Sequence, residues 1–167
     1  MSNKFFLTRK GLAALRQQNA ALLEDLEAST RAMGHSASID NDLRENPEFM
    51  QLRTKVTYQI PNKLAEIEKI LSSFQLIEET TAFRSGNFTE VQPGAEVEVE
   101  SLEDGKRRVF SILGYGDGEP LKGVVSYLSP VGLALLHREV GDEVDLPYEG
   151  DLVTYEVIRI QKIEFLD

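Results

Sequence analysis

Residues 49–74 read FMQLRTKVTYQIPNKLAEIEKILSSF, and their apolar side chains return every three or four positions. These apolar positions are Phe49, Leu52, Val56, Ile60, Leu64, Ile67, Leu71 and Phe74. The spacing predicts an amphipathic helix with one apolar stripe. Three successive intervals of four residues form a stutter, which locally relaxes a left-handed supercoil. Pro61 lies inside the stutter, so we expect a kink or a short break there, with helix on both sides.

A second apolar stripe precedes this one in the chain. It has an alternating three–four spacing with polar interruptions, at Leu12, Leu15, Asn19, Leu22, Leu26, Ser29 and Met33. Thr8 is a suitable N-cap for this helix, and Gly34 is the expected C-cap, because residues 34–38 interrupt the pattern. Two apolar stripes joined by a short polar turn predict a long antiparallel α-helical hairpin, a coiled coil, over residues 1–79. About 30 helical residues give an arm roughly 45 Å long.

The pattern changes from residue 80 onward, where short alternating segments replace the long stripes. Strands are predicted at 96–101, 107–113, 123–127, 143–146 and 152–163, and residues 80–87 are predicted to be a linker or a first strand. Ser129 and Pro130 suit the start of a helix that runs to about Glu139 and stops at Gly141. The expected fold class is therefore α+β, with the hairpin followed by a domain at 80–167 that holds a small antiparallel sheet and one helix.

The charge is distributed unevenly along the chain. The net charge is −10, and all of the acidic excess falls in residues 79–167. Because an acidic domain repels a phosphate backbone, autonomous binding to nucleic acid is not expected. The chain has no cysteine, and it shows neither a stretch of membrane-spanning length nor a signal peptide. The expected location is the cytoplasm.

Four carboxylates gather between the two helical stripes, at Asp40, Asp42, Glu45 and Glu48. Acidic residues near the start of a helix complement its dipole, and this capping role alone would explain them. A functional role is the other interpretation. Two carboxylates on a mobile tip cannot hold magnesium tightly without further ligands, so a metalloenzyme that works alone is not expected.

Four segments in order resemble the Gre transcript-cleavage factors of bacteria. The segment DLRENPEF (residues 42–49) resembles the tip signature of that family, and LTRKGLAALRQQ (residues 7–18) is similar to its opening helix. KLAEIEKILSSFQLIEE (residues 63–79) resembles the end of its second helix. GVVSYLSPVGLALLHREVGDEVDL (residues 123–146) is similar to its Ser-Pro helix and to the Val-Gly-Asp-Glu-Val segment that follows.

The resemblance implies both a fold and a function. In Gre factors the coiled coil enters the secondary channel of a backtracked RNA polymerase, and a C-terminal domain related to FK506-binding proteins docks on the channel rim. The tip acids, matched here by Asp42 and Glu45, help to hold a second Mg²⁺ with the polymerase active site and stimulate cleavage of the nascent RNA 3′ end. The chain would then be a monomeric activator of the polymerase with no cofactor of its own, not an enzyme itself.

The resemblance also assigns supporting roles. The residues expected to support the tip are Asp40, Asn41, Asn46, Glu48 and Phe49. Arg53 and Lys55 are candidates for RNA contact, although ordinary solvated residues would look the same. Docking on the polymerase is assigned to Ser129, Pro130, Leu135, Leu136, Gly141 and Asp142.

The tip departs from the family pattern, and this leaves other functions open. Asn41 stands where the family usually has glycine, Asp40 adds a charge, and Pro47 replaces a common alanine. A Gre-like channel binder that modulates or inhibits transcription without cleavage is the main alternative. A structural or chaperone-like adaptor with prolyl-isomerase character is a third, although the sequence shows no obvious aromatic-lined pocket.

Overall fold

The structure is a computed structural model, and it describes residues 3–166. It is a mixed α+β protein with a long N-terminal helix and a C-terminal sheet, as the sequence predicts. Its contacts form two compact units. The helical unit is Ala13–Ser73, and the sheet unit contains the described residues up to Leu12 together with those from Phe74 onward. The predicted division into a helical hairpin at 1–79 and a β-rich domain at 80–167 stays a prediction.

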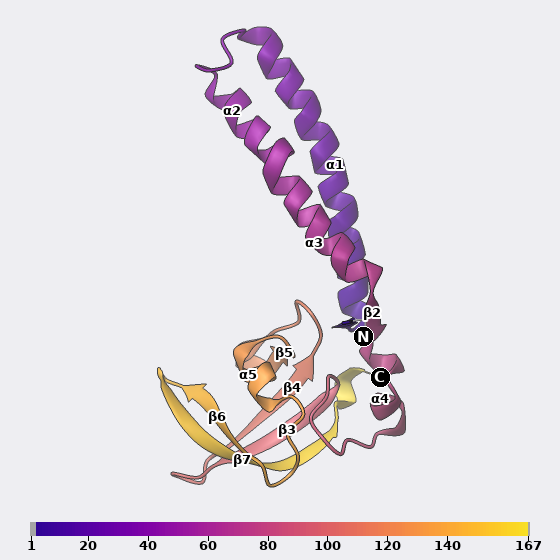
Figure 1. The fold of residues 1–167 in the computed structure, drawn as a ribbon, viewed down its shortest axis with the longest axis vertical. Coiled ribbons are helices and arrows are strands. Elements are labelled where there is room, and N and C mark those ends of the chain that lie inside the picture. The colour runs from indigo at the N-terminus through magenta and orange to yellow at the C-terminus, as the bar shows by residue number, and fades with distance from the viewer. Residues whose placement is uncertain (1–2, 167) are drawn as a thin grey trace. The chain divides into compact units, whose positions relative to one another are not determined.

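The helical unit is built from α1 (Arg9–Ile39), α2 (Pro47–Thr54), the π-helix η1 (Lys55–Gln59) and α3 (Ile60–Ser72). Figure 1 shows α1 and the α2–α3 segment lying side by side, joined at one end by a loop. Every position of the two predicted apolar stripes is buried or half-buried. A Lys55–Asp25 ion pair, 2.8 Å from Nζ to Oδ1, joins the two segments near their middle.

The first helix begins as predicted but ends later. Thr8 caps it, because the Gly11 N–H donates to Thr8 Oγ1 at 2.9 Å. The prediction that Gly34 is the C-cap is wrong, since α1 continues to Ile39 and Gly34 lacks the left-handed conformation of a capping glycine. The cause is Ser36, which is buried and bonded to Asn46 across the unit, so that this turn is held as helix.

The interruption predicted at Pro61 takes the form of a change in hydrogen bonding. Proline lacks an N–H and crowds the carbonyl four residues earlier. In the structure the π-helix η1 precedes Pro61, and the Ile60 N–H donates to the Lys55 carbonyl, five residues back. The wider π turn fits the intervals of four residues in the apolar stripe.

The sheet unit contains five strands in the order β5-β4-β3-β7-β6. They are β3 (Ala95–Ser101), β4 (Arg107–Leu113), β5 (Val124–Ser126), β6 (Glu143–Tyr148) and β7 (Asp151–Lys162), close to the predicted ranges. The sheet is not wholly antiparallel as predicted, because β5 pairs with β4 in parallel. Its inner face carries the core, which includes Val97, Val99, Ile112, Leu146 and Val157.

The ends of the sheet unit differ from the predictions. The short strands β1 (Phe5–Leu7) and β2 (Phe74–Leu76) form a parallel pair that the sequence did not suggest. Residues 80–87 are neither linker nor strand: Thr80 caps the helix α4 (Thr81–Ser85), and Gly86 ends it in the left-handed region. The predicted helix after Ser129 is shorter, since α5 (Pro130–Leu135) stops where His137 bonds to the Val91 carbonyl.

The remaining elements are single turns of 3-10 helix, η2 (Ile77–Glu79), η3 (Pro120–Lys122) and η4 (Glu164–Leu166). Among residues 3–166, no helix combines the length and the apolar character that crossing a bilayer requires.

Candidate functional site

The acidic cluster lies on the loop between α1 and α2, and backbone hydrogen bonds shape it into a turn. The Asp42 N–H donates to Asp40 Oδ1 at 3.1 Å. The Glu45 N–H donates to the Asp42 carbonyl at 3.1 Å. Asp42 and Glu45 are thus the first and fourth residues of a β-turn, which brings their Cα atoms within about 7 Å of each other. The segment is not helical, so this turn, and not a shared helix face, brings the two acids together.

Both acids of the turn are free to act on something outside the helical unit. Asp40, Asp42 and Glu45 are exposed. Within residues 3–166, no side chain bonds or ion-pairs with the carboxylate of Asp42 or Glu45. The N-cap hydrogen bond of α2 comes from Asn46 and not from these acids. The Phe49 N–H donates to Asn46 Oδ1 at 3.0 Å.

Asn46 also links the turn to α1. It is 7% exposed, and its Nδ2 donates to the carbonyl oxygen of Ser36 at 3.2 Å and to the Ser36 hydroxyl at 3.1 Å. Glu48 Oε2 lies 3.5 Å from the same hydroxyl. Phe49 is half-buried on the apolar stripe, and Asn41 is exposed, with its carbonyl accepting from the Leu43 N–H at 3.0 Å. The structure therefore anchors the turn on both helices. Sequence reasoning missed Ser36, since a serine beside Gly34 and His35 suggests a helix break.

The oxygen chemistry of this turn suits a hard divalent cation only when other ligands are present. Within the described part of the chain, no three His, Asp or Glu side chains come together as a metal site. Mg²⁺ in proteins is commonly held by one or two carboxylates together with phosphate oxygens and waters. Asp42 and Glu45 could hold such an ion only if a second molecule supplied the remaining ligands.

The two predicted RNA-contact residues have different surroundings. Arg53 is exposed on α2. Lys55 is held by Asp25, whose pKa is lowered by hydrogen bonds from Lys55 and then from Ser29. Ser29 is 4% exposed, and its hydroxyl donates to Asp25 Oδ1 at 3.0 Å. Lys55 therefore has a role inside the helical unit, whereas the Arg53 side chain forms no ion pair or hydrogen bond with residues 3–166.

The predicted docking segment folds around α5. Ser129 caps this helix through the Gly132 N–H at 3.0 Å, and its hydroxyl donates to the Ser126 carbonyl at 2.7 Å. Pro130 is exposed at the first turn. Leu135 is fully buried and Leu136 packs against the core, so any docking role of Leu135 would be indirect.

Gly141 and Asp142 lie in the turn that leads into β6. Gly141 has a φ of 95°, which favours glycine, and Asp142 Oδ2 accepts from the Glu139 N–H at 2.8 Å. Between residues 128 and 140, three large apolar side chains are exposed: Leu128, Leu133 and Val140, at 42%, 56% and 60%. Sequence reasoning did not single these out, because an exposed leucine and a core leucine look alike in one sequence.

Comparison with known proteins places this chain in a family. Residues 86–162 match the family described as "Transcription elongation factor, GreA/GreB, C-term". The transcription elongation factor GreA of Desulfovibrio desulfuricans is 34% identical over 151 residues, which cover 90% of each chain. GreA of Acidiphilium cryptum is 31% identical over 159 residues, 95% of this chain and 98% of that one.

A solved structure of GreA factor homolog 1 (Gfh1) from Thermus thermophilus is also similar, with 24% identity, a TM-score of 0.42, and coverage of 95% of this chain and 99% of that chain. The assignment rests on the sequence relatives. The chain belongs to the GreA/GreB family of transcription elongation factors.

Proposed function

We propose that this Gre-type elongation factor binds bacterial RNA polymerase and stimulates endonucleolytic cleavage of backtracked nascent RNA, which rescues arrested complexes. In this proposal the helical unit is an antiparallel coiled-coil hairpin that enters the secondary channel. The sheet unit, with an FKBP-like fold, docks on the polymerase. The protein is a monomeric activator in the cytoplasm, and the polymerase itself performs the cleavage.

The observation that carries the proposal is the pair of exposed carboxylates on one turn. Among residues 3–166, no side chain pairs with the carboxylates of Asp42 and Glu45, and the side-chain cap of the helix that follows comes from Asn46. Solvent-exposed acids without a structural role are available to a second molecule. The same two residues match the acids that the family resemblance assigns to cleavage.

The turn and its anchor determine what the two acids can do. The hydrogen bond from the Glu45 N–H to the Asp42 carbonyl keeps the Cα atoms of the two acids within about 7 Å. The Asn46–Ser36 contacts link the base of the turn to α1. Presenting acids in a fixed arrangement lowers the entropy cost of assembling a reactive geometry. Asp42 and Glu45 would be the chain's ligands to a Mg²⁺ ion shared with the polymerase. When bound, that ion supplies charge stabilisation for the attacking and leaving oxygens of the phosphodiester.

The sheet unit offers a surface suited to docking around α5. Leu128 and Leu133 are exposed and lie close to Ser129 and Pro130 in the chain, and Val140 is exposed just before Gly141. Exposed apolar side chains among polar residues are common at protein interfaces. We therefore include these three residues with the docking residues predicted from the sequence.

The test is RNA cleavage in an assembled backtracked complex with magnesium. Wild-type protein should shorten the RNA, and Asp42→Asn and Glu45→Gln should each lower the rate at least 10- to 100-fold, the cost typical even for groups that only support metal ligands. Glu68→Gln removes an exposed carboxylate from α3 and serves as the matched control, with an unchanged rate. Affinity for polymerase is measured separately and should be the same for all four proteins.

One observation favours the alternative of a non-catalytic channel binder. Asp40 adds a third exposed carboxylate to the turn and accepts the Asp42 N–H, so it takes part in shaping the tip. This arrangement could misplace the two acids. Under this alternative the wild-type protein binds polymerase, leaves backtracked RNA uncut and inhibits run-off transcription in competition with an authentic Gre factor.

A further inference from the structure

Two neighbouring arginines on β4 point to opposite faces of the sheet. Side chains alternate along a strand, and Arg107 lies opposite Glu100 while Arg108 lies opposite Val99. Arg107 is on the outer face. Arg108 is on the inner face, which it shares with the core residue Phe110 two positions further along the strand.

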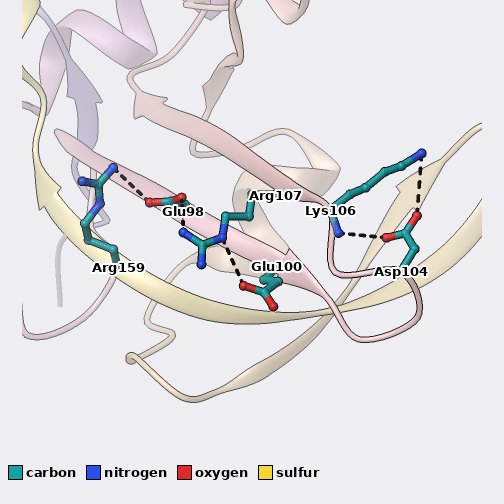
Figure 2. Close-up of polar contacts among 6 residues, drawn as sticks. All are labelled: Glu98, Glu100, Asp104, Lys106, Arg107 and Arg159. Atoms are coloured by element: carbon teal, nitrogen blue, oxygen red, sulfur yellow. Dashed lines mark hydrogen bonds and ion pairs between the residues drawn. The ribbon is translucent and has the colours of Figure 1, made fainter.

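The outer-face arginines are paired with acids. Arg107 Nε lies 3.1 Å from Glu100 Oε2, and its Nη1 lies 3.5 Å from Glu98 Oε1. Arg159 Nη2 lies 3.0 Å from the other oxygen of Glu98. Figure 2 shows these residues forming one network across the strands. The guanidinium groups of Arg107 and Arg159 are therefore already paired with carboxylates.

Arg108 is held by aromatic rings instead. Its guanidinium carbon lies 4.7 Å from the ring centre of Phe110, 5.4 Å from that of Tyr148 and 5.7 Å from that of Tyr155. We call these four residues, together with Pro147, the Arg108 corner. Cation–π contacts of this kind fix the position of the charge without neutralising it.

The guanidinium keeps most of its hydrogen-bonding capacity. It carries five N–H donors. Only Nη1 has acceptors among residues 3–166, the Pro147 carbonyl and the Tyr155 hydroxyl, both at the long distance of 3.5 Å. No carboxylate of the described chain forms an ion pair with it. A preorganised guanidinium with open donors suits an oxyanion that binds through two oxygens.

The residues of the corner differ in exposure, and Arg108 itself is half-buried. Phe110 and Tyr155 are 5% and 3% exposed, whereas Tyr148 is 43% exposed. A ligand could thus reach the guanidinium and lay an apolar group against the Tyr148 ring. A nucleic acid is a poor candidate, because residues 79–167 hold eighteen acidic and eight basic side chains and so repel a polyphosphate.

We propose that the Arg108 corner binds a segment of a protein partner that carries a single carboxylate next to an apolar side chain. One charge in an apolar segment suffers little long-range repulsion from the acidic sheet unit, and it gains a two-oxygen contact with Arg108. None of the residues of the acidic turn takes part, so this proposal and the proposed cleavage function can fail separately.

The test uses the full chain and two capped peptides, acetyl-Gly-Leu-Glu-Leu-Gly-amide and the same peptide with Gln in place of Glu. Binding is followed by NMR through the Arg108 Nε–Hε signal and the Tyr148 ring signals. The Glu peptide should produce saturable shifts at both residues, and the Gln peptide should bind about tenfold more weakly or not at all.

Variants separate binding from folding. Arg108→Gln should lower the affinity for the Glu peptide about tenfold or more. Arg108→Lys should also lower this affinity, because lysine lacks the planar, forked donor group of arginine. Arg107→Gln, on the outer face, is the matched control and should bind normally. If Arg108→Gln lowers the melting temperature but neither peptide shifts the wild-type signals, the aromatic contacts are only structural and the proposal is wrong. Equal shifts with the two peptides, or stronger shifts with inorganic phosphate, would also overturn it.

Discussion

Asn46 and Ser36 bind each other across the helical unit, at the base of the acidic turn. Asn46 Nδ2 donates to the Ser36 carbonyl at 3.2 Å, and the two side chains are also within hydrogen-bond distance, at 3.1 and 3.3 Å. Both residues are at least 90% buried. Because Asn46 also caps α2, one side chain fixes the start of the second helix, the last turn of α1 and the span of the turn between them.

Replacing Asn46 with alanine should therefore cost both stability and activity. The change removes the cap and the hydrogen bonds from Asn46 Nδ2 to Ser36, whose carbonyl keeps only the Asp40 N–H at 3.2 Å. The free energy of unfolding should therefore fall by about 2–3 kcal/mol. Denaturant unfolding measures this loss. Under the proposed function, Asn46→Ala should also slow RNA cleavage at a temperature where it remains folded, since the acids lose their fixed arrangement.

Asn46→Asp is the control for this prediction. It keeps an acceptor for the Phe49 N–H but loses the donors to Ser36, so its stability should lie between those of wild type and Asn46→Ala. If Asn46→Ala and wild type unfold with the same denaturant midpoint, the Asn46–Ser36 contacts do not stabilise the turn.

Arg53 and Lys55 should respond differently to loss of charge. Arg53 is exposed, whereas Lys55 pairs with Asp25 inside the helical unit. Lys55→Gln should lower the melting temperature of the isolated protein and change its salt dependence. Arg53→Gln should leave the melting temperature unchanged and reduce crosslinking of the factor to the RNA 3′ end in a backtracked complex. If Lys55→Gln lost the crosslink while Arg53→Gln kept it, Lys55 and not Arg53 would be the RNA-contact residue.

The Asp25–Lys55 pair also predicts a pH dependence. Hydrogen bonds from Lys55 and Ser29 lower the pKa of Asp25 in the folded protein below its ordinary value of 3.8. The stabilisation is then present above pH 3.8 and is lost as the pH falls through the lower, folded-state pKa. Asp25→Asn should melt below wild type at pH 7, and the difference should shrink as the pH drops below about 3.8. About 1 M salt should also shrink it, since the pair is partly exposed. A difference that stays constant at acid pH would rule out the ion pair as its cause.

The sequence predicted the features that depend on periodicity and local capping. The two apolar stripes, the caps at Thr8 and Ser129, and all five strands of the large sheet follow from patterns within a few neighbouring residues. The features it missed depend on partners distant in the chain. The β1–β2 pair joins residues about seventy positions apart, and α5 stops early because His137 bonds to Val91.

The candidate site shows the same division. The acids of the turn were predicted from residue type and resemblance, but the predicted helix end at Gly34 was wrong. The partner that keeps Ser36 helical is Asn46, ten residues away on the other helix. The Arg108 corner could not be foreseen either, because Phe110, Tyr148 and Tyr155 meet only when β4, β6 and β7 share one sheet.

Two glycines, Gly34 and Gly132, should respond in opposite ways to alanine. Gly34 lies inside α1 with no atom within 4 Å of an added Cβ and without a left-handed backbone. Gly34→Ala should raise the free energy of unfolding by about 0.5–1 kcal/mol, because alanine loses less backbone freedom in a helix. At Gly132 an added Cβ would overlap the Ser126 carbonyl oxygen and lie 3.0 Å from Tyr127 Cα. Gly132→Ala should therefore push α5 away from the strand before it and cost about 1–3 kcal/mol. Thermal unfolding of the two variants beside wild type measures both effects. A lower melting temperature for Gly34→Ala would mean that α1 does end near Gly34 in solution, which would remove the helical turn that Ser36 uses to hold Asn46.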